Sequence, residues 1–359
     1  MRGVIAKIFL FIFVFSSFAA RAEGVDVKEV VLGHIGDSYD WHITTIGEKH
    51  ISIPLPVIVK GKNGEWHCFS SGHLHHSHNG HEGFIVAQDG PYAGKLVEVL
   101  PDGSHYRPLD FSITKTVAGL FINCIVLMLI VLAVARRYRG DTPTTKAKGG
   151  FAGMVEVIVV FVLDEVIKPC IGKNWTKFAP FLLTVFFFIL VNNLMGLIPI
   201  FPAGSNVTGN ITITMVLALS SFVAINAFGS KHYWKDIFWP EVPTWLKVPI
   251  PLMPVIEFVG IFTKPFSLMI RLFANIMAGH AVILILTCIV FATAEMGAAI
   301  NASMSVVAVF LAIFMNCLEL MVAFLQAFVF TMLTSVFIGF AQLEGEHAEH
   351  TEHNGELEK

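Results

Sequence analysis

Charged side chains are scarce in this chain and absent from one long stretch. Asp, Glu, Lys and Arg make up 14% of the 359 residues, whereas an ordinary soluble domain has about 25%. Residues 178–230 contain none of the four. A soluble protein has no place for so long an uncharged stretch, but a membrane protein requires one. The composition therefore predicts a membrane protein, and it excludes disordered, collagen-like and disulfide-scaffold classes.

Several other signals are missing as well. The five cysteines show no framework spacing, so we interpret them as small apolar residues rather than disulfide or metal partners. The net charge of −3 gives no basis for a nucleic-acid partner. No phosphate-binding loop, zinc-protease motif or nucleophile elbow is evident. We therefore expect no enzymatic activity from the chain on its own, no cofactor and no metal centre.

The N-terminus has the pattern of a secretory signal peptide. Arg2 and Lys7 precede an apolar stretch over residues 8–18, and small residues surround a cleavage point after Ala22. A first membrane helix is the alternative. Residues 23–110 are polar and contain short strand-like segments, at 51–59 and 95–100, between Gly-containing turns. We predict a signal peptide over residues 1–22 and a small exported, periplasmic region over residues 23–110.

Three apolar stretches in the middle of the chain predict three membrane crossings, at residues 116–135, 178–200 and 210–228. The first is followed by a basic cluster and the third by two lysines, which indicate the cytoplasmic side: Arg136, Arg137, Arg139, Lys231 and Lys235. Residues 151–167 are apolar but contain three acidic residues and are followed by Pro169. We predict an interfacial or re-entrant helix there, ended by the proline.

Two longer apolar segments follow, at about residues 254–291 and 304–342, joined by a short connection with Gly297 and Asn301. As helices they would be roughly 55 to 60 Å long, in a hydrocarbon layer of about 30 Å. They predict a steeply tilted antiparallel hairpin. The predicted fold is an all-α polytopic membrane protein with about five crossings and one interfacial helix. Its membrane domain covers residues 111–342, and an acidic cytoplasmic tail covers residues 343–359.

Few ionisable residues lie at membrane depth, and each is a functional candidate because a buried charge is costly. Arg271, His280 and Glu319 are the three deep ones, and Glu295 lies near the hairpin turn. Arginine does not deprotonate in proteins, so Arg271 would be a fixed cation rather than a proton carrier. Its anionic partner could come from another subunit. The alternative is an arginine that extends to the membrane surface.

Helical geometry places polar residues on the Arg271 face. Ser267 and Asn275 lie four residues to either side of Arg271. Glu257 lies fourteen residues earlier, about 40° off that face at about 100° per residue. One face of this helix is therefore expected to present a cation with polar neighbours.

The opposite face presents a titratable imidazole. His280 is nine residues after Arg271 and about 180° around the helix. Glu319 and Gln326 share a face of the last helix. In an antiparallel hairpin, Glu319 would lie level with His280 and Gln326 level with Arg271. A straight helix cannot direct Arg271 and His280 at the same neighbour, so we expect curvature or a break at Gly279.

These residues resemble the F-type ATP synthase subunit a family, the membrane stator that faces the rotating c-ring. The resemblance covers roughly residues 110–342. It rests on Lys264-Pro265-Phe266-Ser267 before Arg271-Leu272-Phe273-Ala274-Asn275 and Ala278-Gly279, on Leu325-Gln326-Ala327-Phe328 with Phe330, and on Asn193-Leu194-Met195-Gly196-Leu197-Ile198-Pro199. Two departures are Gly196 and Phe201, where some relatives carry carboxylates. His280 and Glu319 are exchanged relative to many bacterial relatives.

The resemblance implies a function: a proton-conducting stator subunit with two offset half-channels and a fixed arginine facing the c-ring carboxylate. The implied proton-translocation residues are Arg271, Asn275, His280, Glu319, Gln326, Glu257 and Ser267. Arg271 would block leakage, with Asn275 and Gln326 as polar neighbours. His280 and Glu319 would form the periplasmic half-channel pair.

The remaining implied roles concern location and partners. Glu257 and Ser267 would lie at the cytoplasmic exit or on the c-ring face. The implied partners are the c-ring of subunit c, the peripheral stalk subunit b, the rest of the ATP synthase complex and the lipid bilayer. The implied location is the bacterial inner membrane, with the N-terminal region periplasmic and the C-terminus cytoplasmic.

A histidine-rich segment supports a different function. It contains His73, His75, His76, His78 and His81. Such segments can bind zinc or nickel, which makes a metal-ion transporter with a His-rich loop the alternative. A transporter of that kind should also have ligands within several spans, and this chain has almost none. We favour the interpretation as a polar loop.

Overall fold

The computed structural model of the chain describes residues 36–46, 49–76, 80–87, 91–100, 104–139, 149–198, 203–238 and 252–342. The predicted signal peptide and acidic tail lie outside the described residues. The chain divides into two compact units. The first contains Met1–Ile122, Met195–Val207 and Ile276–Met321. The second contains Asn123–Leu194, Thr208–Asn275 and Val322–Lys359.

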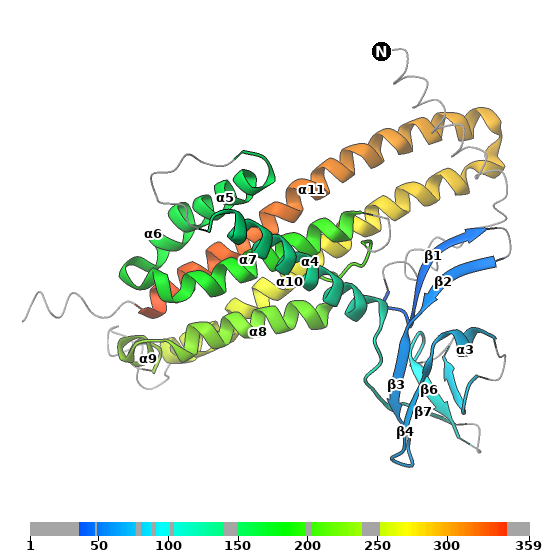
Figure 1. The fold of residues 1–359 in the computed structure, drawn as a ribbon, viewed down its shortest axis with the longest axis horizontal. Coiled ribbons are helices and arrows are strands. Elements are labelled where there is room, and N and C mark those ends of the chain that lie inside the picture. The colour runs from blue at the N-terminus through cyan, green and yellow to red at the C-terminus, as the bar shows by residue number, and fades with distance from the viewer. Residues whose placement is uncertain are drawn as a thin grey trace, which may run out of the picture. The chain divides into compact units, whose positions relative to one another are not determined.

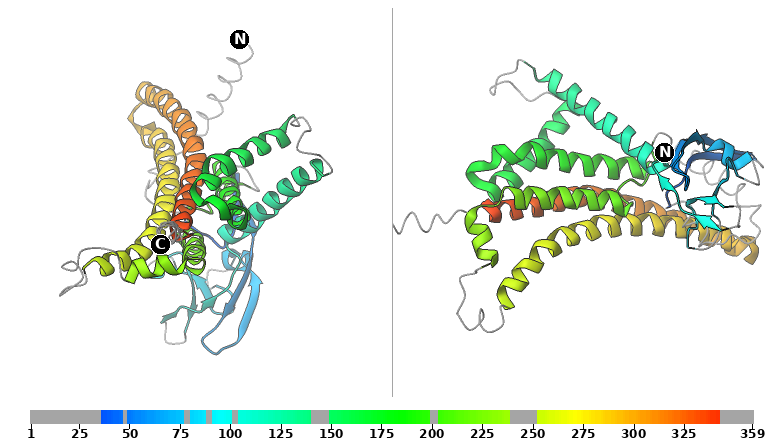
Figure 2. Two further views of the ribbon diagram at one scale, coloured as in Figure 1. Left: turned by 90° about the vertical axis from the view of Figure 1, so that its left-hand side faces the viewer. Right: turned by 90° about the horizontal axis from the view of Figure 1, so that it is seen from below.

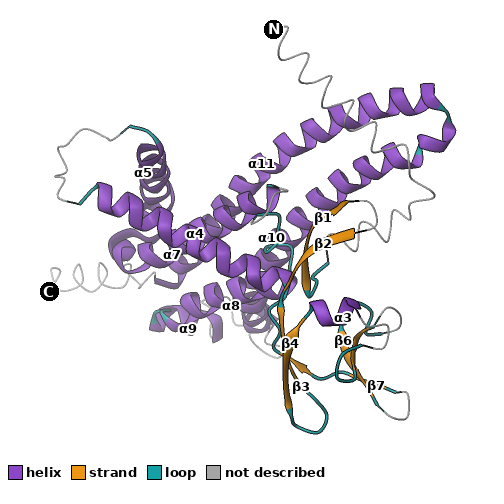
Figure 3. Cartoon of the chain, turned by 45° about the vertical axis from the view of Figure 1, so that its right-hand side comes forward, coloured by secondary structure: helices purple, strands orange, loops and turns teal. Residues whose placement is uncertain are grey.

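The N-terminal part of the first unit consists of short antiparallel strands, shown in orange in Figure 3. β1 (Asp40–Ile46) pairs with β2 (Lys49–Pro54). A three-stranded sheet has the order β4-β3-β8, from β3 (Pro56–Lys60), β4 (Trp66–Ser70) and β8 (Leu109–Asp110). Another has the order β5-β6-β7, from β5 (Phe84–Val86), β6 (Leu96–Val99) and β7 (His105–Tyr106). The predicted strand-like segments are thus strands, and the short helix α3 (Gly72–His76) follows β4.

A small apolar core holds these strands together. Its buried members are Tyr39, Val57, Val59, Phe84 and Leu96. The Tyr39 hydroxyl donates a 2.5 Å hydrogen bond to Asp110 and accepts one from the Leu96 backbone. Burial, followed by the bond to the Asp110 carboxylate, raises the pKa of Tyr39 above its ordinary value. Two strands distant in sequence are thereby fixed to each other.

The strand region continues directly into the first long helix, α4 (Lys115–Arg137). The Asp37 carboxylate accepts hydrogen bonds from both the backbone nitrogen and the hydroxyl of Thr116. The Lys115 nitrogen donates to the Ser38 carbonyl at 2.8 Å. The first N–H groups of a helix have no partner within it, so Asp37 caps α4 from far away in sequence.

In the second unit, helical structure begins at α5 (Phe151–Phe161) and passes through a π-helical segment, η1 (Val162–Ile167), into α6 (Lys168–Ile171). The prediction that Pro169 ends this helix is wrong. The wide π turn lets the Lys168 N–H bond the Leu163 carbonyl, five residues back, and proline itself has no N–H that needs an acceptor. The helix ends instead at Gly172, whose positive φ of 70° permits the turn.

The chain then folds back through η2 (Gly172–Asn174) into α7 (Trp175–Leu197), which returns beside α5 and α6 in Figure 1. Phe161 of α5 stacks on Phe328, and Phe186 of α7 lies edge-on to Phe324. Both helices therefore pack on the same later helix. The helices α8 (Ile211–Ala227) and α9 (Lys231–Phe238) follow, with a bend of 102° between them.

The last two helices are the longest, α10 (Leu252–Ala292) with 41 residues and α11 (Ala298–Gln342) with 45 residues. Figure 2 shows each as an uninterrupted helix. The short η4 (Ala294–Met296) and Gly297, with φ 105°, connect them. Thr293 donates to Asn301 across this turn at 3.1 Å. The predicted helical hairpin is confirmed, whereas the helix α10 has no break at Gly279.

Four helical segments of the described chain are long and apolar enough to cross a membrane, and a fifth is added if α8 and α9 form one span. The four are Lys115–Arg137, Phe151–Leu197, Met253–Ala292 and Ala298–Gln342. The predicted all-α polytopic class is therefore confirmed for the membrane part. A buried cluster that includes Phe186, Ile189, Leu272 and Ile338 forms the core of the second unit.

Candidate site within the membrane helices

The structure brings together two of the predicted site residues, His280 of α10 and Glu319 of α11. His280 Nδ1 lies 2.9 Å from Glu319 Oε1, and their side chains are 18% and 3% exposed. The prediction that they lie at the same level of the hairpin is confirmed. An acid and an imidazole at this distance can share one proton, either as an ion pair or as two neutral groups.

Two glycines lie next to this pair, and one of them, Gly279, allows the close approach. A Cβ atom at Gly279 would lie 3.0 Å from Glu319 Oε1, which is tighter than ordinary contact. A Cβ atom at Gly196 would lie 3.7 Å from His280 Nε2. Gly196 is one of the two positions at which the sequence departs from the resemblance described above. The structure places this position directly beside the imidazole.

The carboxylate of Glu319 is buried without a hydrogen-bond donor. Neither of its oxygens has a hydrogen-bond partner among the described residues, because the His280 ring is close but not aligned for a hydrogen bond. A buried carboxylate without donors is costly in its charged form.

Arg271 has different surroundings. It is exposed, as are Ser267 and Asn275 on the same face of α10. Leu268 and Leu272, on the other side of the helix, are 2% and 1% exposed and belong to the apolar core. Among the described residues Arg271 makes no ion pair. The α10 helix therefore presents a cation and two small polar side chains away from the protein core.

Among the described residues, the other two predicted site residues make no hydrogen bond or ion pair with Arg271. Gln326 is 6% exposed on α11, and Glu257 is half-buried on α10. That Gln326 lies level with Arg271 along the hairpin stays a prediction. Gln326 is directed toward the buried side of its helix, next to Ala327, which is fully buried.

Sequence reasoning missed a set of buried amides in the second unit. The Asn123 side chain donates to Asn192 at 2.9 Å, and Thr208 donates to Asn193 at 2.7 Å. Asn193 in turn donates to the Ala323 carbonyl at 3.2 Å. These bonds tie α4, α7, the segment before α8 and α11 together. The consecutive asparagines inside an uncharged helix were the available signal.

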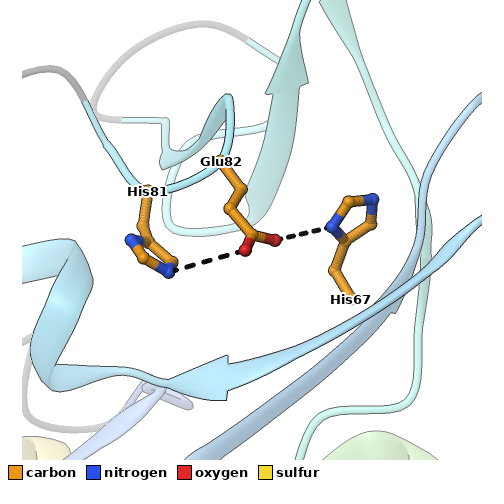
Figure 4. A network of polar contacts seen from close by, with 3 residues as sticks. All are labelled: His67, His81 and Glu82. Carbon is orange, nitrogen blue, oxygen red and sulfur yellow. Dashed lines mark hydrogen bonds and ion pairs between the residues drawn. The ribbon is translucent and has the colours of Figure 1, made fainter.

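In the strand region, the histidine-rich segment and a neighbouring strand form a small polar network, drawn in Figure 4. His67 Nδ1 lies 2.6 Å from Glu82 Oε2, and His81 Nε2 lies 3.9 Å from Glu82 Oε1. The ring of His73 stacks on that of His81 at 4.9 Å. Within the described part of the chain, no three His, Cys, Asp or Glu residues are arranged to hold a metal ion. The side chains of His75, His76 and His78 lie outside the described residues.

These features define a class: a helical membrane protein with a buried carboxylate beside a half-buried imidazole and an outward-facing arginine. Comparison with known proteins specifies it further. The family model described as ATP synthase A chain matches residues 118–339. A second model, described as Domain of unknown function (DUF8433), matches residues 30–111.

Curated relatives agree with the family match. "ATP synthase subunit a" of Chlorobium phaeobacteroides is 40% identical over 246 residues, which are 67% of this chain and 68% of the relative. "ATP synthase subunit a 2" of Chlorobaculum tepidum is 43% identical over 237 residues, 65% and 64% of the two chains. "ATP synthase subunit a" of Myxococcus xanthus is 40% identical over 266 residues, 72% and 80% of the two chains. The chain belongs to the ATP synthase A chain family.

Proposed function

We propose that this chain is the proton-conducting stator subunit of a bacterial F-type ATP synthase, without catalytic activity of its own. The observation that carries the proposal is the pair of the half-buried His280 and the buried Glu319, with 2.9 Å between the nearest atoms. A group that binds and releases a proton inside a membrane is costly to maintain and is typical of a proton relay. The pair supplies one acid and one base for such a relay.

The arginine supplies the second part of the mechanism. Arg271 is exposed on the side of α10 away from the apolar core, and we place its counter-charge outside the described chain. In the proposal this is the carboxylate of a c-ring subunit. A permanent cation repels protons and favours the ionised form of a carboxylate opposite it. Ser267 and Asn275 would flank this contact, and Gln326 and Glu257 would line it or the cytoplasmic exit.

Rotation requires two water-accessible half-channels that never connect. A membrane potential supplies about 2.3 kcal/mol per charge per 100 mV, which is lost as leakage if protons pass without turning the ring. We assign His280 and Glu319 to one half-channel and Arg271 to the barrier. The proposed partners are the c-ring, subunit b, the remaining ATP synthase subunits and the bilayer. The proposed location is the inner membrane, with the strand region periplasmic and the C-terminus cytoplasmic.

No described contact favours the alternative metal-ion transporter. The three deep ionisable residues of the long hairpin include one that cannot ligate a cation, Arg271. His280 and Glu319 alone provide too few ligands for a transition metal. The histidine network of the strand region also lacks three suitably placed ligands among the described residues.

The decisive test is the replacement of Arg271 in the intact complex. Arg271→Ala should abolish ATP synthesis driven by an imposed proton gradient. Arg271→Lys should fail or nearly fail, because a lysine can lose its proton when desolvated and lacks the planar guanidinium. Arg136→Ala, at the exposed end of α4, is the matched control and should retain synthesis. Near-normal coupled synthesis in Arg271→Ala would refute the role.

A further inference from the structure

One face of the β4-β3-β8 sheet is exposed although it is apolar. In β3, Val57 and Val59 are fully buried and pack in the small core of the strand region. Side chains alternate between faces along a strand, so Ile58 and Lys60 lie on the other face. An antiparallel sheet with one covered face normally presents polar side chains on the other. This sheet presents Trp66, Leu109 and Phe111 at 59%, 62% and 62% exposure.

The register of the sheet places these residues on one surface. Lys60 is paired with Trp66 on one side and with Leu109 on the other, so the three side chains point the same way. The rings of Trp66 and Phe111 are 5.7 Å apart, and the Lys60 Nζ lies 5.7 Å from the Trp66 ring centre. We call this surface the aromatic face; it consists of Ile58, Lys60, Trp66, Cys68, Leu109 and Phe111.

Hydrogen bonds hold the aromatic face close to the start of α4. Phe111 and Ile113 donate backbone hydrogen bonds to Ile58 and Pro56. The next contacts, from Lys115 and Thr116, tie the first turn of α4 to the segment before β1. Four residues separate Phe111 from Lys115 and span at most about 14 Å. The sheet therefore lies where this helix enters the membrane, without a flexible linker between them.

The helix itself presents apolar side chains to its surroundings. Phe121, two turns into α4, is 57% exposed. Farther along, Ile125, Met128 and Leu129 are 57%, 62% and 62% exposed. In a membrane protein such side chains face lipid. Exposed apolar side chains are therefore present both on the sheet and on α4.

We propose that the aromatic face lies in the headgroup layer of the leaflet at which α4 begins. Tryptophan is enriched in that layer because its indole is apolar with one polar N–H, and lysine can keep its stem there with the ammonium in water. Lys60 beside Trp66 has this chemistry. The proposal requires only that α4 spans the membrane and stands apart from the function of His280 and Arg271. A protein partner on this face is the competing outcome of the test.

The test uses the purified whole complex in lipid nanodiscs. A photoreactive benzoylphenylalanine is introduced at Trp66 or at Phe111, and at Val99 as the control. Val99 lies in β6 and is also exposed, at 37%. Illumination should give lipid adducts at Trp66 and Phe111 at several-fold higher yield than at Val99, detected by mass spectrometry. Equal lipid yields at all three positions, or adducts to another protein subunit, would overturn the proposal.

A second measurement uses the conservative substitution Trp66→Phe. The fluorescence of Trp66 is taken as the difference between the native complex and the complex with Trp66→Phe. This difference should be quenched more strongly by lipids with a nitroxide at the headgroup than by lipids with a nitroxide at the acyl end. The absence of quenching by either lipid would place Trp66 away from the bilayer and contradict the proposal.

Discussion

Two stretches of α10, nine residues apart, have opposite environments. Around Arg271 the polar side chains are exposed and make no described ion pair. Around His280 the helix is in close contact with α11, and the imidazole lies 2.9 Å from a nearly fully buried carboxylate. One helix therefore combines an exposed polar surface around Arg271 with a close side-chain pair at His280. The difference shows that the cation and the titratable pair need not share a neighbour.

After the loss of synthesis expected for Arg271→Ala, the next largest effect should come from the His280–Glu319 pair. Glu319→Gln keeps the shape of the side chain but removes its proton site, and we expect proton flux to fall about 10²-fold, the scale of a positioned acid–base group. His280→Glu and Glu319→His should each slow transport, because two like groups disturb each other's titration. The double exchange restores one acid and one imidazole and should recover a substantial part of the flux. ATP-driven acidification of inverted membrane vesicles measures all four variants.

The outcome of the double exchange separates a pair from two independent residues. A double variant no better than the worse single variant would show that the two residues do not act together. Arg271→Ala should have a different effect. It should uncouple proton flow from ATP synthesis while the contact between His280 and Glu319 stays unchanged.

A smaller effect should follow from narrowing the space around the pair. A Cβ at Gly279 lies 3.0 Å from Glu319 Oε1, and overpacking of this kind costs about 1–3 kcal/mol. Gly279→Ala should reduce proton pumping several-fold, and Gly279→Val more. Gly260→Ala is the matched control on the same helix, because a Cβ there meets nothing within 4 Å. Equal rates for Gly279→Ala and Gly260→Ala would contradict the tight contact.

Asn123→Ala should lower the thermal stability of the complex without directly affecting the His280–Glu319 pair. It leaves the buried Asn192 amide oxygen without its 2.9 Å donor, at a cost of about 1–3 kcal/mol. Asn316→Ala is the control, because Asn316 is exposed and, within the described part of the chain, its side chain bonds only the Ala312 carbonyl of its own helix. Thermal unfolding of the detergent-solubilised complex, followed by loss of the subunit, should show a lower midpoint for Asn123→Ala alone. Identical midpoints would show that the bond between Asn123 and Asn192 does not stabilise the complex.

The smallest effect should come from the histidine-rich segment. Replacement of His73, His75, His76, His78 and His81 with Ser should leave ATP-driven proton pumping nearly unchanged, because this segment lies in the strand region, outside the proposed half-channels. A large loss of pumping that added zinc restores would favour a metal-dependent role instead.

The sequence predicted the features that follow from helix arithmetic. A rise of about 1.5 Å per residue is enough to place Glu319 level with His280. The length of the two apolar segments at the end of the chain is enough to predict the long hairpin. The sequence did not predict the continuation past Pro169, because this depends on a π turn that no composition signal marks. It also missed the bond between Asn123 and Asn192, since contacts between distant helices depend on packing rather than on local pattern.

The capping of α4 by Asp37 has a practical consequence for imaging. Membrane subunits of this kind offer few features outside the bilayer by which particles can be aligned. Here the strand region is bonded to the first helical turn through Lys115 and Thr116, so a bulky tag inserted in the β3–β4 turn at Gly64 would mark the position of that turn. The strand region would then act as a fiducial marker for the start of α4.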